Sequence, residues 1–270
     1  MSKFILASSN AEAWVNIMEY LMGQPGGKCF HLVTSIADPV SEIREVTQIV
    51  DSLANGFKIP STMENANAIW PFALAPPKND LKSTIRRMQE FAVPLIKLAH
   101  IKHADSYLER LVAWRSKDSG PKISQLEKIV ERMQSEVGNP APKSSAYELS
   151  VFSPGLDAGY MSFPCLSHLS FKLDTQNRTI HLAALYRNHH FVGHGYGNFV
   201  GLGRLMLFVA RQVGYGVGEL LSVSTHADGE FSRGRKQIQD HVAKARASLA
   251  SCSALNSGDL QDVELRQLEV

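Results

Sequence analysis

The spacing of apolar residues changes repeatedly along the amino-terminal part of the chain. An apolar run at 3–7 predicts a strand, and apolar side chains three or four positions apart predict a helix at 11–22. The same order returns with a strand at 29–36 and a helix at about 38–55. The chain therefore begins with two strands that alternate with two helices.

A long helical pattern occupies the region from about 80 to 114. The stripe that should face the core consists of Ile85, Met88, Phe91, Leu95 and Leu98. Pro94 falls inside this pattern, and we expect a kink or a break there because proline removes a backbone donor and crowds the preceding turn. Just ahead of it, the stretch 61–74 is polar at its start and apolar at its end, which favours a strand reached from a loop.

Alternating apolar positions in the second half of the chain predict a β-hairpin. Its strands are expected at 161–173 and 179–185, joined by the polar turn at 174–178. A shorter strand is expected at 147–152, ahead of the hairpin. A helix at 199–213 and a further strand follow the hairpin.

Composition limits the class of protein. The 270 residues, 44% of them hydrophobic, can bury one large core or two modest ones. A net charge of +2 indicates no nucleic-acid partner, and three widely separated cysteines argue against a disulfide framework. The amino terminus lacks the apolar region of a signal peptide, and no apolar run reaches the roughly 18 residues that span a bilayer. We therefore expect a cytoplasmic protein without a membrane partner.

Three residues suited to chemistry stand in order in the second half. Cys165 follows Pro164 at the first hairpin strand and Arg187 follows the second, so a hairpin should bring both to one end. Asn198 comes after a glycine-rich stretch, just ahead of the predicted helix. This order, with a spacing between Arg187 and Asn198 that needs no gap, resembles the nucleotide-binding core of the thymidylate synthase and pyrimidine hydroxymethylase superfamily.

The resemblance implies a fold of the α/β (α+β) class. A thymidylate synthase-like fold has three layers, in which a large mixed β-sheet carries helices on one face and meets a second copy with the other. We therefore expect a homodimer. The resemblance is clearest over residues 61–230. We expect one domain over 1–270 with a helical, polar extension at about 231–270, made of a basic helix at 233–250 and a polar tail.

The resemblance also implies a reaction. Cys165 would add as a thiolate to C6 of a uracil-type base, with Arg187 lowering the pKa of the thiol and contacting a phosphate. Asn198 would read N3 and O4 of the base, because an amide offers both a donor and an acceptor, and its alternative role is a helix N-cap. C5 would then attack the one-carbon unit of 5,10-methylenetetrahydrofolate, so that the enzyme is a methyltransferase or a hydroxymethyltransferase.

Other site residues follow from the resemblance by position. Glu90 falls where the family keeps a glutamate for proton transfer, although a solvent-facing helix glutamate is the alternative. Tyr107 and Trp114 bound the segment YLERLVAW, which resembles a family segment, and we assign Tyr107 to the substrate and Trp114 to the cofactor. Asn188 replaces a serine that touches phosphate, and His190 stands where an aspartate holds the pterin of the folate.

The position that contacts the sugar hydroxyl has two candidates. Counting without gaps places Asp228 and Glu230 where the family has a histidine and a tyrosine. A shift of two residues places His226 at the histidine position. We keep both His226 and Asp228 as candidate substrate contacts.

The phosphate-binding groups depart from the family. No arginine lies between Phe57 and Leu74, and the adjacent arginines that would reach a partner's phosphate fall at Ser145 and Ala146. The terminal segment that closes over folate is not evident. The alternative hypothesis is a degenerate member that binds a pyrimidine nucleotide, or a nucleoside-containing ligand, without folate chemistry.

Two other kinds of site are less compatible with the sequence. The glycine-rich stretch GHGYGNFVGLG fits neither a Walker loop nor the dinucleotide fingerprint. His189, His190, His194 and His226 could ligate a metal, but the cysteine or carboxylate spacing of a standard site is missing. We therefore expect no metal.

Overall fold

A mixed β-sheet forms the centre of the molecule. The computed structural model describes residues 2–75, 80–99, 106–115, 122–157 and 164–267. Their strands are β1 (Lys3–Ser9), β2 (Lys28–Asp38), β3 (Glu148–Ser150), β4 (Leu166–Asp174), β5 (Thr179–Tyr186), β6 (His189–His190) and β7 (Gly216–Asp228). The sheet order is β1-β2-β7-β5-β4-β3, with β6 paired to β7. The mixed α/β character expected from the sequence is confirmed.

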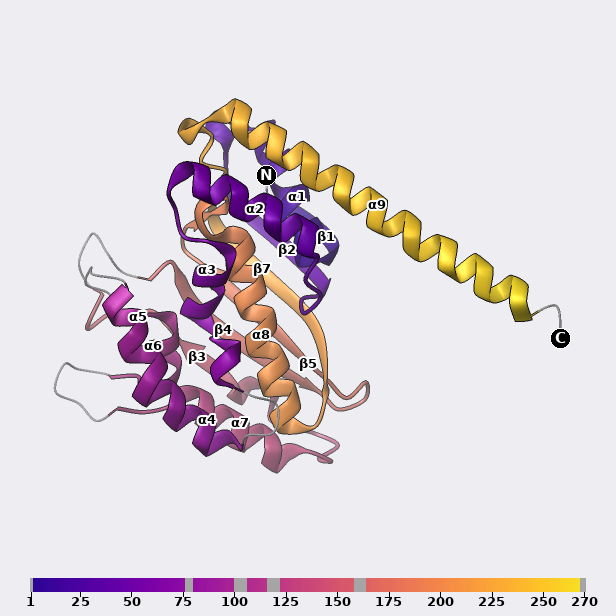
Figure 1. The fold of residues 1–270 in the computed structure, drawn as a ribbon. Helices are drawn as coiled ribbons and strands as arrows, with labels where there is room; N and C mark the ends of the chain where they lie inside the picture. The colour runs from indigo at the N-terminus through magenta and orange to yellow at the C-terminus, as the bar shows by residue number, and fades with distance from the viewer. Residues whose placement is uncertain (1, 76–79, 100–105, 116–121, 158–163, 268–270) are drawn as a thin grey trace.

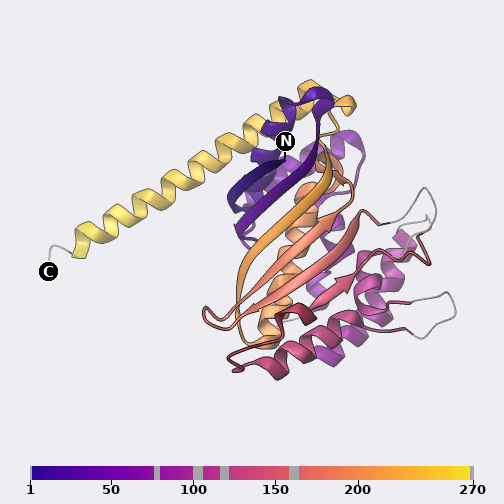
Figure 2. The same cartoon turned by 180° about the vertical axis from the view of Figure 1, so that it is seen from behind.

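The helices gather on one face of this sheet (Figure 1), and the view from behind shows the other face open (Figure 2). They are α1 (Asn10–Met22), α2 (Arg44–Phe57), α3 (Thr62–Ile69), α4 (Leu81–Arg87), α5 (Val93–Ala99), α6 (Tyr107–Val112), α7 (Gln125–Glu136), α8 (Tyr196–Val213) and α9 (Arg235–Gln267). No helix among the described residues is both long and apolar enough to cross a membrane.

The amino-terminal strands and helices form as the sequence predicts. β1 and β2 are parallel neighbours joined through α1, and α1 begins where the Ser9 side chain accepts a hydrogen bond from the Glu12 N–H. Trp14 is fully buried on the face of α1 that the apolar spacing indicated. β7 then pairs antiparallel to β2 and parallel to β5, so it joins the two halves of the sheet.

The stretch 61–74 contains a helix where a strand was expected. The Ser61 hydroxyl accepts from the Glu64 N–H, and the Glu64 carboxylate accepts from the Ser61 N–H. This reciprocal capping box satisfies backbone donors at the start of α3. The strand prediction was wrong because the polar residues at the start of this stretch are a helix cap.

The long helix expected from 80 to 114 is interrupted near Pro94, as predicted. α4 passes into a π-helical turn at Met88–Ala92, and α5 starts directly after it. Pro94 lies just after the π-turn within one continuous helical run, so its missing N–H falls where the helical hydrogen-bond pattern changes. The interruption has a consequence for every side chain that follows, because a π-turn inserts an extra residue and rotates the helix face.

The predicted inward stripe of this region was therefore only half right. Ile85 and Met88 are buried, whereas Phe91, Leu95 and Leu98 are 57%, 60% and 76% exposed. Ala92 and Val93 take the buried positions beyond the π-turn. The apolar spacing assumed one continuous α-helix, and the rotation at Met88–Ala92 turns its second half outward.

The predicted β-hairpin is confirmed. β4 and β5 pair antiparallel, and the Asp174 carboxylate accepts from the backbone N–H groups of Gln176 and Asn177 in the turn between them. Residues 161–163 of the expected first strand lie outside the described residues. On the far side of the hairpin, the short β3 pairs with β4.

α8 starts three residues earlier than the sequence indicated. A π-helical turn at Phe191–Gly195 leads into α8, so Asn198 lies inside the first turn of the helix. The N-cap interpretation of Asn198 was therefore wrong. Gly203, farther along α8, allows close packing, because an added Cβ would fall 1.8 Å from the Pro39 carbonyl oxygen.

α9 extends beyond the basic helix expected at 233–250. Ile238, Val242 and Ala245 anchor its first half in the core. The helix continues to Gln267, where a polar tail was expected, and its second half projects away from the body (Figures 1 and 2).

Candidate functional site

A pocket of about 190 Å³ lies between the start of β4, the β5–β6 connection and α8. Its lining consists of Asn65, Ala68, Tyr107, Cys165, Asn188, His189, His190, His194 and Asn198. Segments far apart in sequence thus meet at one place. Five residues singled out from the sequence lie together here: Cys165, Tyr107, Asn188, His190 and Asn198.

The hairpin positions Cys165 against Arg187. The Arg187 backbone N–H donates to the Cys165 carbonyl over 2.9 Å, and the Arg187 Nε donates to the Pro164 carbonyl over 3.1 Å. Burial raises the pKa of the Cys165 thiol, and the nearby Arg187 charge opposes this increase without cancelling it. Arg187 thus acts in the expected direction, but the net pKa of the thiol is raised because burial outweighs its charge.

Tyr107 lies directly beside Cys165. Burial raises the pKa of the Tyr107 hydroxyl above its ordinary range, and the neighbouring Cys165 adds to the increase. Hydrogen bonds with the backbone of Leu166 and Cys165 act in the opposite direction. Tyr107 is thus a neutral phenol near neutral pH, able to donate a hydrogen bond but unable to supply charge.

Asn198 is held by a buried histidine. Its Nδ2 lies 3.2 Å from His189 Nε2, and His189 Nδ1 lies 3.0 Å from Ser224 Oγ on β7. Burial, with smaller contributions from His194 and His190, lowers the pKa of His189 to about 3. The His189 ring is therefore neutral, with one donor and one acceptor nitrogen.

A second set of polar contacts surrounds Asn188. Its Nδ2 lies 2.8 Å from His190 Nε2, and its Oδ1 lies 2.6 Å from His226 Nδ1. The Glu230 carboxylate accepts from the Gly193 N–H over 2.6 Å and lies 3.8 Å from His190 Nδ1. His226 thus touches the pocket through Asn188 rather than lining it directly.

Arg187, which contacts Pro164 and Cys165, is not itself part of the lining, and three other predicted site residues also lie outside it. Asp228 pairs with Lys28 over 2.9 Å and accepts from the Glu230 N–H over 2.7 Å. Glu90 is half-exposed and pairs with Arg86 over 2.8 Å, as its solvent-facing alternative describes. Trp114 lies 5.6 Å from the Arg110 guanidinium. The described structure does not bring these three side chains to Cys165.

Asn65 and His194 complete the wall and were not among the predicted site residues. Asn65 Nδ2 donates to the Gly193 carbonyl over 2.9 Å, and Asn65 Oδ1 lies 2.7 Å from His194 Nδ1. Asn65 was missed because its helix was expected to be a strand. Across the described ranges, no group of three or more histidine, cysteine or carboxylate side chains is placed to hold a metal ion.

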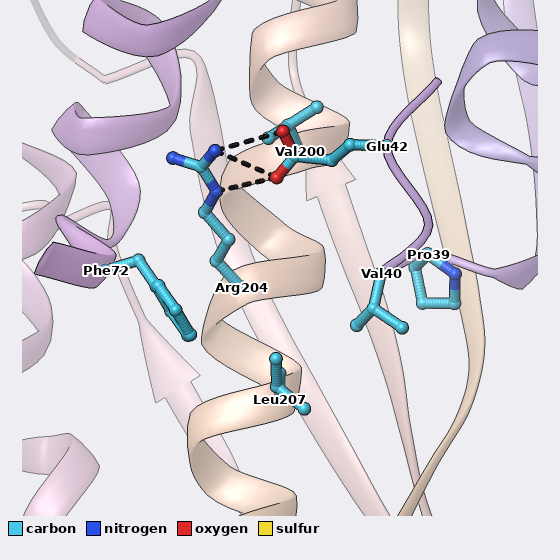
Figure 3. Close-up of a pocket in the computed structure, with 7 residues that line it drawn as sticks. All are labelled: Pro39, Val40, Glu42, Phe72, Val200, Arg204 and Leu207. Atoms are coloured by element: carbon cyan, nitrogen blue, oxygen red, sulfur yellow. Dashed lines mark hydrogen bonds and ion pairs between the residues drawn. The ribbon is translucent and has the colours of Figure 1, made fainter. Parts of the chain in front are cut away.

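A second hollow of about 280 Å³ lies on the opposite side of α8 (Figure 3). Val200, Arg204 and Leu207 face it from α8, roughly half a turn from Asn198 at about 100° per residue. Arg204 donates to both carboxylate oxygens of Glu42 over 2.8 and 3.1 Å. Arg204 and Glu42 neutralise each other, and the residues that line this hollow include no nucleophile. The Cys165 pocket is therefore the better candidate for a catalytic site.

Comparison with known proteins gives relatives over part of the chain. No family model matches. Proteins named "Putative thymidylate synthase" from Methanosarcina mazei and Methanosarcina acetivorans are 28% identical over 142 residues, and one from Methanococcoides burtonii is 29% identical over 144 residues. Each match covers 52% of this chain and 60% of the relative.

These matches show a distant homology to proteins named as putative thymidylate synthases, which makes the chain a divergent thymidylate synthase-like protein. The chain is a distant and divergent homologue of proteins named as putative thymidylate synthases, at 28% identity over about half of its length. The resemblance read from the sequence is thus confirmed. The matched part spans 60% of the length of those relatives, so their activity extends to this chain only as a proposal.

Proposed function

We propose that the pocket binds a uracil-type nucleotide or nucleoside and that Cys165 adds to C6 of its base. This addition is the step that prepares C5 for one-carbon transfer of the thymidylate synthase or hydroxymethylase type. The observation that carries the proposal is the convergence of Cys165, Tyr107 and Asn198 on one pocket from three separate elements.

The amide of Asn198 is suited to the edge of a uracil ring. With one Nδ2 hydrogen directed at His189, the second hydrogen and Oδ1 are available to a ligand. Oδ1 would accept from N3–H, and Nδ2–H would donate to O4. Two such bonds fix the base in register with the Cys165 sulfur.

The addition step balances without another reagent. The Cys165 proton leaves to solvent, and a sulfur electron pair forms the bond to C6. The C5–C6 π pair shifts so that negative charge develops on O4, where an Asn198 N–H would stabilise it. C5 thereby becomes nucleophilic. Because the pKa of the Cys165 thiol is raised, removal of this proton is the costly part of the step.

The described residues do not provide an evident folate site. Of the two residues assigned to folate, Trp114 stacks near Arg110 outside the pocket lining. His190 lines the pocket, but its Nε2 already contacts Asn188 and its Nδ1 is buried beside Glu230. The source of the one-carbon unit is therefore a question for experiment.

A second candidate function is ligand binding without group transfer. The raised pKa of Cys165 and the engaged His190 both favour it. In that case Asn198 and Asn188 would still recognise a pyrimidine nucleotide or nucleoside, and Cys165 would stay a neutral thiol.

The open sheet face supports a homodimer as part of the same proposal. Phe4 pairs with Val33, Val33 with Val223, and Val223 with Leu185 in neighbouring strands. These side chains share the face away from the helices and form an apolar row across four strands. A second copy of the chain would remove this row from water.

Mass spectrometry of the intact protein with 5-fluoro-dUMP, in the presence and absence of 5,10-methylenetetrahydrofolate, tests the proposal. We expect a covalent adduct on Cys165 that is lost in Cys165→Ser and kept in Cys29→Ser, a control cysteine on β2. An adduct that includes the folate supports one-carbon transfer from it, and an adduct of nucleotide alone supports addition without it. Absence of any adduct in the folded protein contradicts thiol addition and favours the binding function.

A further inference from the structure

We infer that His189 is a positioning residue that fixes the orientation of the Asn198 amide and so makes the pocket select bases with N3–H beside a C4 carbonyl. The inference rests on the proposed pyrimidine binding and deepens it. The His189 side chain is 1% exposed at the edge of the pocket, and its Nε2 contacts the Asn198 amide, so we argue that it acts on the base through that amide.

Packing fixes the His189 ring. Its side chain is 1% exposed, and its ring stacks on Tyr186 with centroids 4.0 Å apart and planes 11° apart. Phe191 lies 4.4 Å from the ring and Phe199 approaches it edge-on at 5.8 Å. Aromatic rings on several sides leave His189 no room to turn, so its two nitrogens keep their separate partners.

The His189 tautomer follows from the orientation that the Asn198 amide has in this structure. An amide nitrogen only donates, so the 3.2 Å contact with Asn198 Nδ2 requires Nε2 to be the acceptor. The ring proton then resides on Nδ1 and is donated to Ser224 Oγ over 3.0 Å. The depth of burial keeps a second proton off the ring near neutral pH, so Nε2 stays an acceptor.

This tautomer discriminates between bases. With Nδ2 held by His189, Asn198 presents Oδ1 as an acceptor and one N–H as a donor, the complement of the N3–H and O4 of uracil. Cytosine offers an acceptor at N3 and a donor at N4, so it would require the opposite amide orientation. That orientation would set the Asn198 oxygen against the unprotonated His189 Nε2, with lone pairs facing each other.

Calorimetric titration with dUMP and with dCMP measures this selection. We expect the wild-type protein to prefer dUMP, and His189→Phe, which keeps a ring in the stack and removes both nitrogens, to reduce the preference by about tenfold. Ser224→Ala should reduce it in the same direction by a smaller factor. Ser222→Ala is the matched control, since Ser222 is buried on the same face of β7 two residues away and should leave the preference unchanged.

Nitrogen-15 spectra of the His189 imidazole in the wild-type protein without ligand provide the second measurement. We expect a protonated Nδ1 and an unprotonated Nε2. A proton on Nε2, or an unchanged dUMP preference in folded His189→Phe, overturns the positioning role. Failure of the wild-type protein to bind either nucleotide instead overturns the proposed function, and the base selection falls with it.

Discussion

The Cys165 thiol experiences two opposing influences that a sequence can reveal only in part. Arg187 was identified from the spacing, and the hairpin does place it beside Cys165. Tyr107 was assigned to the substrate by resemblance, but the depth of the pocket was not visible, because Asn65 enters it from a helix that was expected to be a strand. The sign of the pKa shift of Cys165 follows from that depth. Charge could therefore be predicted at this site, and desolvation could not.

Alkylation of Cys165 by iodoacetamide tests the balance of these influences. Because its pKa is raised, the thiolate forms at higher pH than in a free cysteine, and the rate should rise with pH through a correspondingly higher midpoint. Arg187→Gln removes the opposing charge, so the midpoint should move up further and the rate at pH 8 should fall roughly several-fold. The measurement uses a Cys29→Ser, Cys252→Ser background. A midpoint below that of free cysteine would contradict the conclusion that burial outweighs the Arg187 charge.

His189 shows a different limit of residue-level prediction. The sequence presented it as one of four histidines that could hold a metal. Its role emerges only when Tyr186, Phe199 and Ser224, all from other elements, surround its ring. A histidine inside an aromatic cluster has a lowered pKa, which no local pattern encodes.

Helix phase is the main lesson at the scale of elements. The apolar spacing at 80–99 correctly predicted a helix and correctly placed a break near Pro94. It could not predict the π-turn at Met88–Ala92. Such a turn holds one residue more than an α-helical turn and rotates every later side chain, but no distinctive residue type marks it in the sequence. Likewise, α3 was missed because its capping box resembles a loop in sequence.

Two substitutions in this helical region test which side chains face the core before and after the π-turn. Ile85→Ala should lower the free energy of unfolding by about 2–5 kcal/mol, since Ile85 is 2% exposed. Leu95→Ala should change it by less than about 0.5 kcal/mol, since Leu95 is 60% exposed. Urea unfolding of both variants compares them under one condition. Equal losses would show that the predicted continuous stripe, and not the rotated one, is correct.

At the scale of the whole molecule, the open face of the sheet is an apolar surface that the helices of this chain do not cover. Burial alternates along β1, so Ile5 and Ala7 are buried while the equally apolar Phe4 and Leu6 are 55% and 69% exposed. The apolar run at 3–7 predicted the strand, and the period of two along a strand determines which of its residues share a face. This period could not predict which face carries the helices, because that depends on connections between elements.

Sedimentation equilibrium tests the homodimer. We expect the wild-type protein to be dimeric at micromolar concentration, and Phe4→Asp or Leu6→Asp to shift it to monomer, because a carboxylate in an apolar contact loses hydration. Leu98→Asp is the control, since Leu98 is 76% exposed on α5, among the helices. A monomeric wild type, or dimers unaffected by both sheet variants, would contradict the proposed interface.

The central place of β7 determines when the sheet can be completed while the protein is being synthesised. β7 lies between β2 and β5, yet it is the last strand of the sheet to leave the ribosome. Until β7 has emerged, β2 and β5 each lack a central neighbour, and no described strand links the two halves of the sheet. Ser224, the partner of His189, arrives on the same strand. The strand that joins the sheet therefore also brings the hydroxyl that lies against the His189 ring beneath the pocket.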